Sequence, residues 1–375
     1  MSTEVQASWL ADTAAARADA GLHRVLRPRA AGSDVLDLAS NDYLGLGRDP
    51  RVVRAAIEAV TEWGAGSTGS RLVTGSTELH VELERALAGL VGAPAALVFS
   101  SGYLANLAAV TALAGPDCLV VSDAGNHASL VDACRLSRSR VVVTRHGDLA
   151  AIEIALSERT ESRAVLVVDA INSADGDLLP LAELQVLALR YGAVLVVDDA
   201  HGIGVRGAGR GAAAEAGIAD QPNVLTTVTL SKSLGSQGGA VLGSIAVIEH
   251  LVDTARPFIF DTGLNPAAAG AALAAVRIVG EQPELAEAVL GRAGELAKIC
   301  GVNPTDSAVV PVLVGAAQAA YDRSIALLDK GIRVGCFRPP AVPAGTARLR
   351  ITARASLTDA DLDRFCAVFA EVSGR

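Results

Sequence analysis

The hexapeptide AVLVVD occurs twice in this chain, at residues 164–169 and 193–198, and these two copies decide the fold class. In each copy the apolar and β-branched residues run on without alternation, which indicates a strand that is buried on both faces. The segment LAELQVLALRYG (181–192) lies between them, has apolar residues at helical spacing and ends in a glycine. A strand, a helix and a second strand in this order predict a parallel sheet covered by helices.

Five further runs of the same kind extend the pattern along the chain. They are AALVF (95–99), CLVVS (118–122), RVVVT (140–144), VLTTVTL (224–230) and AVLGS (240–244). We therefore predict an α/β protein with a mostly parallel, seven-stranded sheet whose strands are covered on both faces.

The length of the chain indicates more than one domain, since 375 residues exceed the size that a single core usually serves. The segment NPAAAGAALAAVRIV (265–279) predicts a long linking helix, after which short strands alternate with helical segments. We predict an N-terminal helix and arm over 1–45, a large α/β domain over 46–265, and the linking helix with a smaller C-terminal α/β domain over 266–375.

Composition and charge exclude several classes of partner. The formal net charge is −9 and no stretch is polybasic, so we expect neither nucleic acid nor an anionic membrane surface as a partner. The N-terminus has no apolar core of signal-peptide length and no apolar run is long enough to span a bilayer, which predicts a cytoplasmic protein. The six histidines show no metal-ligand spacing, and we expect no metal. The five cysteines include no CxxC pair, which predicts reduced thiols that pack in the interior.

Polar side chains follow five of the predicted strands. The carboxyl ends of parallel strands meet at one edge of the sheet, where ligands bind. A lone aspartate at a strand end is usually a helix cap, and a lone lysine can extend from a surface loop. Together on one edge, however, a carboxylate, histidines, hydroxyls and a lysine indicate a functional site. In chain order, these groups are Ser100 to Tyr103 with a helix expected from near Asn106, His127, Ser173, the trio Asp198, Asp199 and His201, and the trio Thr229, Ser231 and Lys232.

The lysine stands in TLSKSLGSQGGAV (229–241), where nearly every neighbour is small or apolar. Desolvation disfavours its ammonium form, which lowers its pKa and makes the amine available for a Schiff base. Asp198 is suited to keep a pyridinium nitrogen protonated, and a lysine with such an acid is the arrangement that holds pyridoxal 5'-phosphate (PLP). The residues around FSSGY (99–103) and the lysine loop supply amides and hydroxyls for its phosphate. His127 is a candidate for the ring stacked on the pyridine.

Two glycine patterns raise a more distant alternative, an NAD-dependent oxidoreductase. GAGSTG (64–69) has GxGxxG spacing but follows a helical stretch, which is the wrong context for a dinucleotide site. GIGVRG (202–207) does follow a strand, and Asp220 lies downstream of it. Against this alternative, the acidic DDAH (198–201) precedes the glycines and no clear helix follows them.

Eight motifs in consistent order, within about residues 20–370, resemble the α-oxoamine synthases, a family of PLP-dependent enzymes. They are SNDYLGL (40–46), GAGSTGSRLVTGSTELHVELE (64–84), FSSGYLAN (99–106), NHAS (126–129), SADGD (173–177), VDDAHGIG (197–204), TLSKSLGSQGG (229–239) and FRPPAVPAGTARLRI (337–351).

This resemblance implies PLP fold type I, which is aspartate aminotransferase-like, and a homodimer with active sites between the subunits. It also implies acyl transfer to an amino acid with decarboxylation. The motifs GSTGSRLVTGST and RPPAVPAGTARLR, together with the short chain, favour the branch that condenses L-alanine with a pimeloyl thioester in biotin biosynthesis. Glycine C-acetyltransferase and other branches that use the same constellation stay open as alternatives, as does the acyl carrier, which is either coenzyme A or acyl carrier protein.

The resemblance also implies the roles of the site residues towards the cofactor. Four of them are expected to be catalytic: Lys232 as the Schiff-base lysine and general base, Asp198 as the partner of the ring nitrogen, His201 as the contact to the ring oxygen and His127 as the stacked ring. The remaining cofactor contacts are expected from Gly102, Tyr103 and Thr229 near the phosphate, Ser173 beside the ring oxygen, and Thr262 on the phosphate of the neighbouring subunit.

For the substrates, the resemblance implies that Asn41 and Arg350 hold the amino acid carboxylate. Arg338 and the loop around Ala341 are expected to line the acyl-chain entrance, with Arg24 at the far end of the acyl group. One departure from the family pattern lies in INSADGD (171–177), where Asn172 and Ala174 stand in place of bulkier apolar residues.

Overall fold

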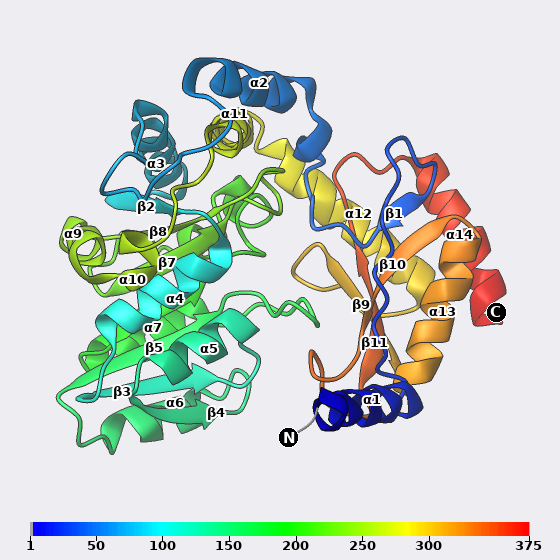
Figure 1. Cartoon of the computed structure of the whole chain (residues 1–375), viewed down its shortest axis with the longest axis horizontal. Helices are drawn as coiled ribbons and strands as arrows, with labels where there is room; N and C mark the ends of the chain where they lie inside the picture. Colours follow the sequence, from blue (N-terminus) through cyan, green and yellow to red (C-terminus); the bar gives the residue numbers. More distant parts are fainter. Residues whose placement is uncertain (1–2, 375) are drawn as a thin grey trace.

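The computed structural model describes residues 3–374, with side chains from residue 8 onward. Two sheets organise the chain, and they lie side by side in Figure 1. The larger sheet has the strand order β2-β8-β7-β6-β5-β3-β4. Its strands are β2 (Ala95–Phe99), β3 (Cys118–Asp123), β4 (Arg140–Thr144), β5 (Arg163–Asp169), β6 (Val194–Asp198), β7 (Val224–Thr229) and β8 (Gly239–Gly243).

All seven predicted strands are present in this sheet. Strands β3 to β7 pair in parallel, whereas β8 is antiparallel to both of its neighbours. The two copies of AVLVVD are adjacent and in register, so that Asp169 lies opposite Asp198 at the carboxyl edge. The prediction of a mostly parallel, seven-stranded sheet is confirmed.

The continuous apolar runs divide between two cores because successive strand residues point to opposite faces. In β5, Leu166 and Val168 join one core cluster while Val165 and Val167 join the other. One face is covered by helices α4 (Gly102–Leu113), α5 (Ala128–Leu136), α9 (Ile245–Thr254) and α10 (Arg256–Ile259). The other is covered by α2 (Pro50–Trp63), α3 (Glu78–Val91), α6 (Leu149–Ser157), α7 (Leu181–Arg190), α8 (Ala212–Glu215) and α11 (Pro266–Glu281).

Strand β4 departs from the predicted burial. It is the edge strand of the sheet, and the helices that cover the centre leave it partly open. Val143 is 65% exposed as a result. The prediction that both faces of every strand are covered is therefore wrong for β4.

The smaller sheet has the order β1-β10-β11-β9 and gathers the two ends of the chain. The N-terminal segment contributes α1 (Thr3–Asp19) and β1 (Leu36–Leu38), which pairs in parallel with β10. Helix α11 packs on α2 and α3 and leads into the C-terminal elements. These are α12 (Glu284–Cys300), β9 (Val309–Gly315), α13 (Ala317–Asp329), β10 (Ile332–Phe337), β11 (Ala347–Thr352) and α14 (Asp359–Ser373). The domain boundaries stay predictions.

Three local features complete the fold. Helix α4 begins at Gly102, earlier than the expected start near Asn106, because Ser101 caps it by accepting a hydrogen bond from the Leu104 amide at 3.2 Å. Short 3₁₀ turns occur at η1 (Leu46–Arg48) and η2 (Gly207–Gly209). All five cysteines are free, but Cys366 is exposed on α14, so the prediction that all five pack in the interior is wrong for it. Within residues 3–374, no helix has the length and apolar character needed to cross a bilayer.

Candidate active site

The polar residues predicted from the strand ends do meet at the carboxyl edge of the large sheet. Asp198 ends β6, Thr229 ends β7, and Lys232 follows three residues later. His127 caps the start of α5, just after β3. Arg350 reaches the same place from β11 of the small sheet and donates from Nε to the Ser173 carbonyl at 2.6 Å. The site therefore lies where the two sheets face each other.

Lys232 is a partly buried amine in contact with an imidazole. Its Nζ lies 2.8 Å from Nε2 of His201, whose Nδ1 lies 2.8 Å from the hydroxyl of Tyr43. Burial lowers the pKa of Lys232 to about 8, against the opposing effect of Asp198. Burial and the nearby Lys232 charge also hold the pKa of His201 well below its usual range. Near neutral pH the site therefore combines a neutral imidazole with a lysine that exists in part as the free amine.

Asp198 has more hydrogen-bond donors than its buried neighbour Asp169. Its Oδ2 accepts from Asn106 Nδ2 at 2.6 Å and its Oδ1 from the Ala200 amide at 2.9 Å. Its cross-strand neighbour Asp169 accepts the His127 amide at 3.1 Å through Oδ2, while Oδ1 is buried without a hydrogen-bond partner. Burial and the charge of Asp198 raise the pKa of Asp169 well above its usual range. Burial therefore disfavours a negative charge on Asp169, whereas the Asp198 carboxylate is held by two hydrogen-bond donors.

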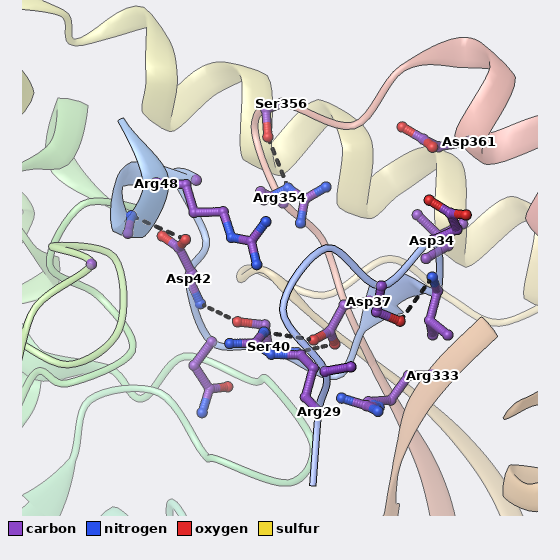
Figure 2. Close-up of a pocket in the computed structure, with 18 of the residues that line it drawn as sticks. Arg29, Asp34, Asp37, Ser40, Asp42, Arg48, Arg333, Arg354, Ser356 and Asp361 are labelled. Atoms are coloured by element: carbon purple, nitrogen blue, oxygen red, sulfur yellow. Dashed lines mark hydrogen bonds and ion pairs between the residues drawn. The ribbon is translucent and has the colours of Figure 1, made fainter. Parts of the chain in front are cut away.

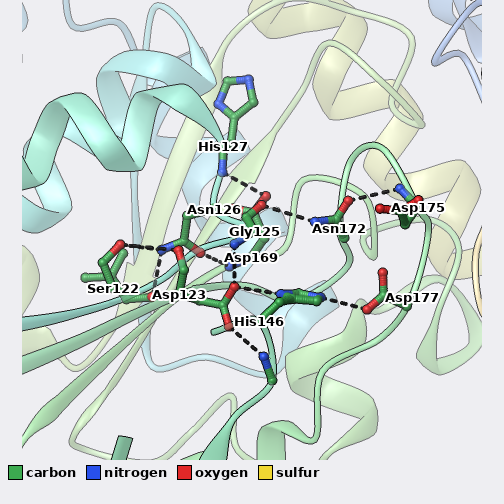
Figure 3. Close-up of polar contacts among 12 residues, drawn as sticks. Ser122, Asp123, Gly125, Asn126, His127, His146, Asp169, Asn172, Asp175 and Asp177 are labelled. Atoms are coloured by element: carbon green, nitrogen blue, oxygen red, sulfur yellow. Dashed lines mark hydrogen bonds and ion pairs between the residues drawn. The ribbon is translucent and has the colours of Figure 1, made fainter. Parts of the chain in front are cut away.

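His127 presents its ring to the edge of the sheet. Its Nδ1 lies 2.7 Å from the Ser129 hydroxyl, which in turn accepts from Asn106 at 2.8 Å. Figure 3 shows the His127 ring pointing away from the polar network that holds its backbone. The residue is exposed, so a face of the ring is open to a flat ligand.

The start of α4 forms a cradle for an anion. The amides of Gly102 and Tyr103 precede the first bond of the helix, Ala105 N–H to the Ser101 carbonyl, and such first-turn amides point out of the helix. Gly102 packs so closely on Thr229 that a Cβ at residue 102 would lie 3.1 Å from that side chain. This close approach lets the helix start lie beside the end of β7. The hydroxyl of Tyr103 donates to Asp132, so the backbone of Tyr103 faces the cradle while its side chain binds α5.

Arg350 forms the clamp at the small-sheet side of the site. Its Nη1 donates to Asn41 Oδ1 at 2.9 Å and its Nη2 to the Tyr43 hydroxyl at 3.0 Å. Its side chain is buried and stacks on Phe337, with the guanidinium carbon 5.2 Å from the ring centroid. Because Asn41, Tyr43 and the Ser173 carbonyl are all neutral partners, the guanidinium charge is left for an anionic ligand.

The residues predicted for the acyl chain lie together at the N-terminal arm. Arg338 is buried, donates to the carbonyls of Gly21 at 2.5 Å and His23 at 3.2 Å, and stacks on the ring of Tyr321. Arg24 Nη2 lies 3.5 Å from the carbonyl of Pro339, and Ala341 is exposed in the same loop. The immediate role of Arg338 in this chain is thus to anchor the arm, and a role of any of the three towards an acyl chain stays a prediction.

Thr262 lies apart from this group. It is exposed and forms an isolated bridge with Ser70. No contact joins it to Lys232 within the described residues of this chain. This placement is compatible with the prediction that it acts on the neighbouring subunit, and it leaves that prediction untested.

A charged groove of about 750 Å³ adjoins the site. Its lining includes Asn41 and Ser231, the residue that precedes Lys232, and Figure 2 shows Arg48 and Arg354 extending into it near Asp42. The groove therefore gives the site a polar approach from the side of the N-terminal arm.

The departure noted in the turn after β5 has a local explanation. Asn172 is buried, and its Oδ1 accepts the amides of Ala174 and Asp175, both at 2.9 Å. Its Nδ2 donates to the Gly125 carbonyl at 3.2 Å. The asparagine thus fixes the turn that carries Ser173, a task that an apolar residue could not perform.

Three residues of the site were missed in the sequence: Tyr43, Asn106 and Asp169. Each stands inside a stretch that was singled out for another residue. Asp169 ends the first copy of AVLVVD as Asp198 ends the second, so the repeated hexapeptide itself carried the signal. Tyr43 and Asn106 become visible only through their partners, Arg350 and Asp198.

The residues present fit the predicted PLP. A partly free amine, a buried acid held by two donors, an open imidazole face and a cradle of helix amides lie at the carboxyl edge of the large sheet, as the aldehyde, ring nitrogen, ring face and phosphate of that group require. The alternative of an NAD site gains no support. The glycines at 202–207 lead into η2 and the four-residue α8, which is too short to offer a helix start to a pyrophosphate.

Comparisons with known proteins agree with this fit. The model of the family described as aminotransferase class I and II matches residues 33–369. The chain is 61% identical over 367 residues to 8-amino-7-oxononanoate synthase of Mycobacterium sp. (strain KMS), covering 97% of this chain and 96% of that protein. A solved structure of SPT with a PLP internal aldimine is 30% identical, with a TM-score of 0.90 and coverage of 100% of this chain and 99% of that one. Serine palmitoyltransferase from Sphingomonas wittichii is 29% identical with a TM-score of 0.91, covering 98% and 96% of the two chains.

Proposed function

The chain belongs to the class I and II aminotransferase family and, within it, to the PLP-dependent α-oxoamine synthases, and we propose that it makes 8-amino-7-oxononanoate for biotin biosynthesis. In this reaction L-alanine condenses with a pimeloyl thioester, and the thiol carrier and carbon dioxide leave. The observation that carries the proposal is the 61% identity, over nearly the full length of both chains, to a protein of that name.

The cofactor requirement follows from the family. When bound, PLP supplies a cationic ring that withdraws electrons from Cα of the amino acid. We assign Asp198 to the ring nitrogen, because its carboxylate is already oriented by hydrogen bonds from Asn106 and the Ala200 amide. The amides of Gly102 and Tyr103 and the hydroxyl of Thr229 are the groups we assign to the phosphate.

Lys232 is the residue we assign to proton transfer at Cα of alanine. With a pKa of about 8, its amine is neutral often enough to accept a proton near neutral pH. His201, 2.8 Å away and uncharged, provides a neutral hydrogen-bond partner for both the amine and the ammonium form. A charged imidazole at this distance would oppose protonation of the lysine, so the low pKa of His201 supports this role.

Arg350 and Asn41 are the residues we assign to the alanine carboxylate. The guanidinium is already fixed by Tyr43 and the Ser173 carbonyl, so little side-chain entropy is lost when a carboxylate binds. Tyr43 contacts both Arg350 and His201, so it links the carboxylate site that we assign to the imidazole that contacts Lys232.

The remaining parts of the proposal concern the assembly and the acyl substrate. We propose a homodimer in which Thr262 of one subunit serves the phosphate of the other. Arg24, Arg338 and Ala341 would lie along the acyl chain. Coenzyme A and acyl carrier protein both remain candidates for the carrier, and we propose a cytoplasmic location because the substrates of such a synthase are water-soluble thioesters and amino acids.

A direct assay tests the proposed function. The purified protein, loaded with PLP, is incubated with L-alanine and pimeloyl-CoA, and the product is identified by mass. We expect 8-amino-7-oxononanoate and the free thiol in equal amounts. Glycine with acetyl-CoA is the comparison substrate pair, and a clear preference for that pair would identify the protein as a glycine C-acetyltransferase and contradict the proposal.

A further inference from the structure

A charged cluster outside the assigned site joins three loops at the carboxyl edge of the large sheet. His146 follows β4, and its two ring nitrogens contact two acids. Nδ1 lies 2.6 Å from Oδ1 of Asp123 at the end of β3, and Nε2 lies 2.7 Å from Oδ2 of Asp177 after β5. Figure 3 shows the imidazole lying between the two carboxylates.

The contacts of this imidazole favour its charged form. An ionised carboxylate only accepts hydrogen bonds, so each ring nitrogen must donate, and both nitrogens carry protons only in the imidazolium form. Consistent with this, the hydrogen bonds to Asp123 and Asp177 raise the pKa of His146 to about 10. His146 is thus a fixed cation at physiological pH.

The first arm of the cluster holds the loop that presents His127. Asp123 accepts the Gly125 amide at 2.6 Å through Oδ1 and the Gly147 amide at 2.8 Å through Oδ2. His146 lies directly against Gly125, where a Cβ would be 2.5 Å from its Nδ1. Asp123 and His146 therefore hold the loop at Gly125, two residues before His127.

The second arm holds the turn that carries Ser173. Asp177 ends this turn, and its carbonyl accepts the Asn172 amide at 3.0 Å. From the other side, Arg350 donates to the Ser173 carbonyl, and Arg348 pairs with Asp175 of the same turn. The turn is thus held between His146 on the large sheet and two arginines of β11 on the small one.

We propose that His146 is a positioning residue of the active site: as an imidazolium between Asp123 and Asp177, it fixes the loop of His127 relative to the turn of Ser173. It acts through these loops and contacts neither substrate nor cofactor itself. The inference rests on the proposed function to the extent that His127 and Ser173 are taken as contacts of PLP. An apolar residue at 146 could not join the two loops, because it has no hydrogen-bond donor for either carboxylate.

The test uses four variants of the full-length protein. His146→Gln removes the cation. Asp177→Asn weakens one arm of the cluster at a half-exposed residue, so we expect this variant to keep the core intact. Asp177→Glu keeps the carboxylate and serves as the conservative rescue. His250→Gln is the matched control, because His250 is exposed on α9 and bonds to the Ala112 carbonyl, far along the chain from these loops.

Two measurements do not depend on turnover. The NMR chemical shifts of the imidazole nitrogens in the cofactor-free protein report the charge of His146. We expect His146 to remain positively charged at pH 8. Absorbance titration with PLP reports the cofactor Kd, which we expect to rise about tenfold in His146→Gln and by a smaller factor in Asp177→Asn. Asp177→Glu and His250→Gln are expected to stay within about twofold of the wild-type Kd.

Measurements of kcat and of thermal stability then distinguish a positioning role of His146 from a role in folding. We expect kcat to fall in His146→Gln with little change in the thermal midpoint of the PLP-bound protein. A neutral His146 at pH 8 would overturn the proposal, and so would wild-type PLP affinity in both His146→Gln and Asp177→Asn. Absence of turnover with alanine and pimeloyl thioester in the wild type would instead refute the proposed function, while the charge and affinity measurements would still decide the role of His146.

Discussion

The low pKa of Lys232 makes a prediction about stability that needs no substrate. The change is Lys232→Met, which keeps most of the side-chain volume and removes the titrating amine. Burial lowers the pKa of this lysine from 10.5 to about 8 in the folded protein, whereas the unfolded chain keeps the usual value. At pH 8 about half of the folded lysine is the free amine, compared with about 0.3% for an ordinary lysine.

The direction of the pH dependence of stability follows from how many protons the folded and unfolded chains bind. Below pH 8 the lysine is charged in both states, and its burial costs stability. Between pH 8 and 10.5 the unfolded chain binds more protons than the folded one, so the free energy of unfolding of the wild type rises with pH relative to the variant. The lowered pKa of Lys232 corresponds to a change of about 3 kcal/mol in the relative free energy of unfolding over that range.

Urea unfolding of the PLP-free proteins at intervals from pH 7 to 10.5 measures this difference. The titration of His146, whose pKa is also near 10, occurs in both proteins and cancels. At pH 7 we expect the free energy of unfolding to be larger for the variant than for the wild type. By pH 10.5 the difference between the two should have changed by about 3 kcal/mol in favour of the wild type. A difference between the two proteins that is independent of pH would refute the argument that Lys232 is held as a desolvated amine.

Three other changes test further parts of the site. Asp198→Asn removes the charge assigned to the cofactor nitrogen, and steady-state assays should show kcat reduced by at least about a hundredfold; near-normal kcat would contradict that role. Arg350→Lys loses the fork that meets Asn41, so we expect KM for L-alanine to rise by about tenfold to a hundredfold, whereas an unchanged KM would move the carboxylate site elsewhere. Arg338→Ala frees the carbonyl of Gly21, and limited proteolysis should then cut the N-terminal arm faster; an arm that stays resistant would show that Arg338 is not its anchor.

The sequence predicts those parts of the fold and site that depend on local pattern. The seven strands are visible because short continuous runs of apolar and β-branched residues are typical of strands that are covered on both faces. Asp198 and Lys232 are visible because each follows such a run at the edge where parallel strands end. Edge position is not a local property, and RVVVT (140–144) therefore gave no sign that β4 would be partly exposed.

The parts that were missed depend on partners far along the chain. Tyr43 meets Arg350 across 307 positions, and Arg338 meets the Gly21 carbonyl across 317. The charged form of His146 is favoured by acids 23 and 31 positions away, one at the end of β3 and the other in the turn after β5. Residue type alone does not separate such a cation from an ordinary surface histidine, because the distinction lies in which acceptors the fold brings to its ring nitrogens.

The central claim is that the amine of Lys232 holds the cofactor covalently, and peptide mass spectrometry after borohydride reduction tests it most directly. The protein is saturated with PLP, reduced, digested and compared with Lys232→Ala treated in the same way. We predict a single reduced adduct on the peptide that contains Lys232, and none on the variant. Recovery of an unmodified Lys232 peptide from the wild type, with PLP absorbance retained or with the adduct on another lysine, would contradict the account.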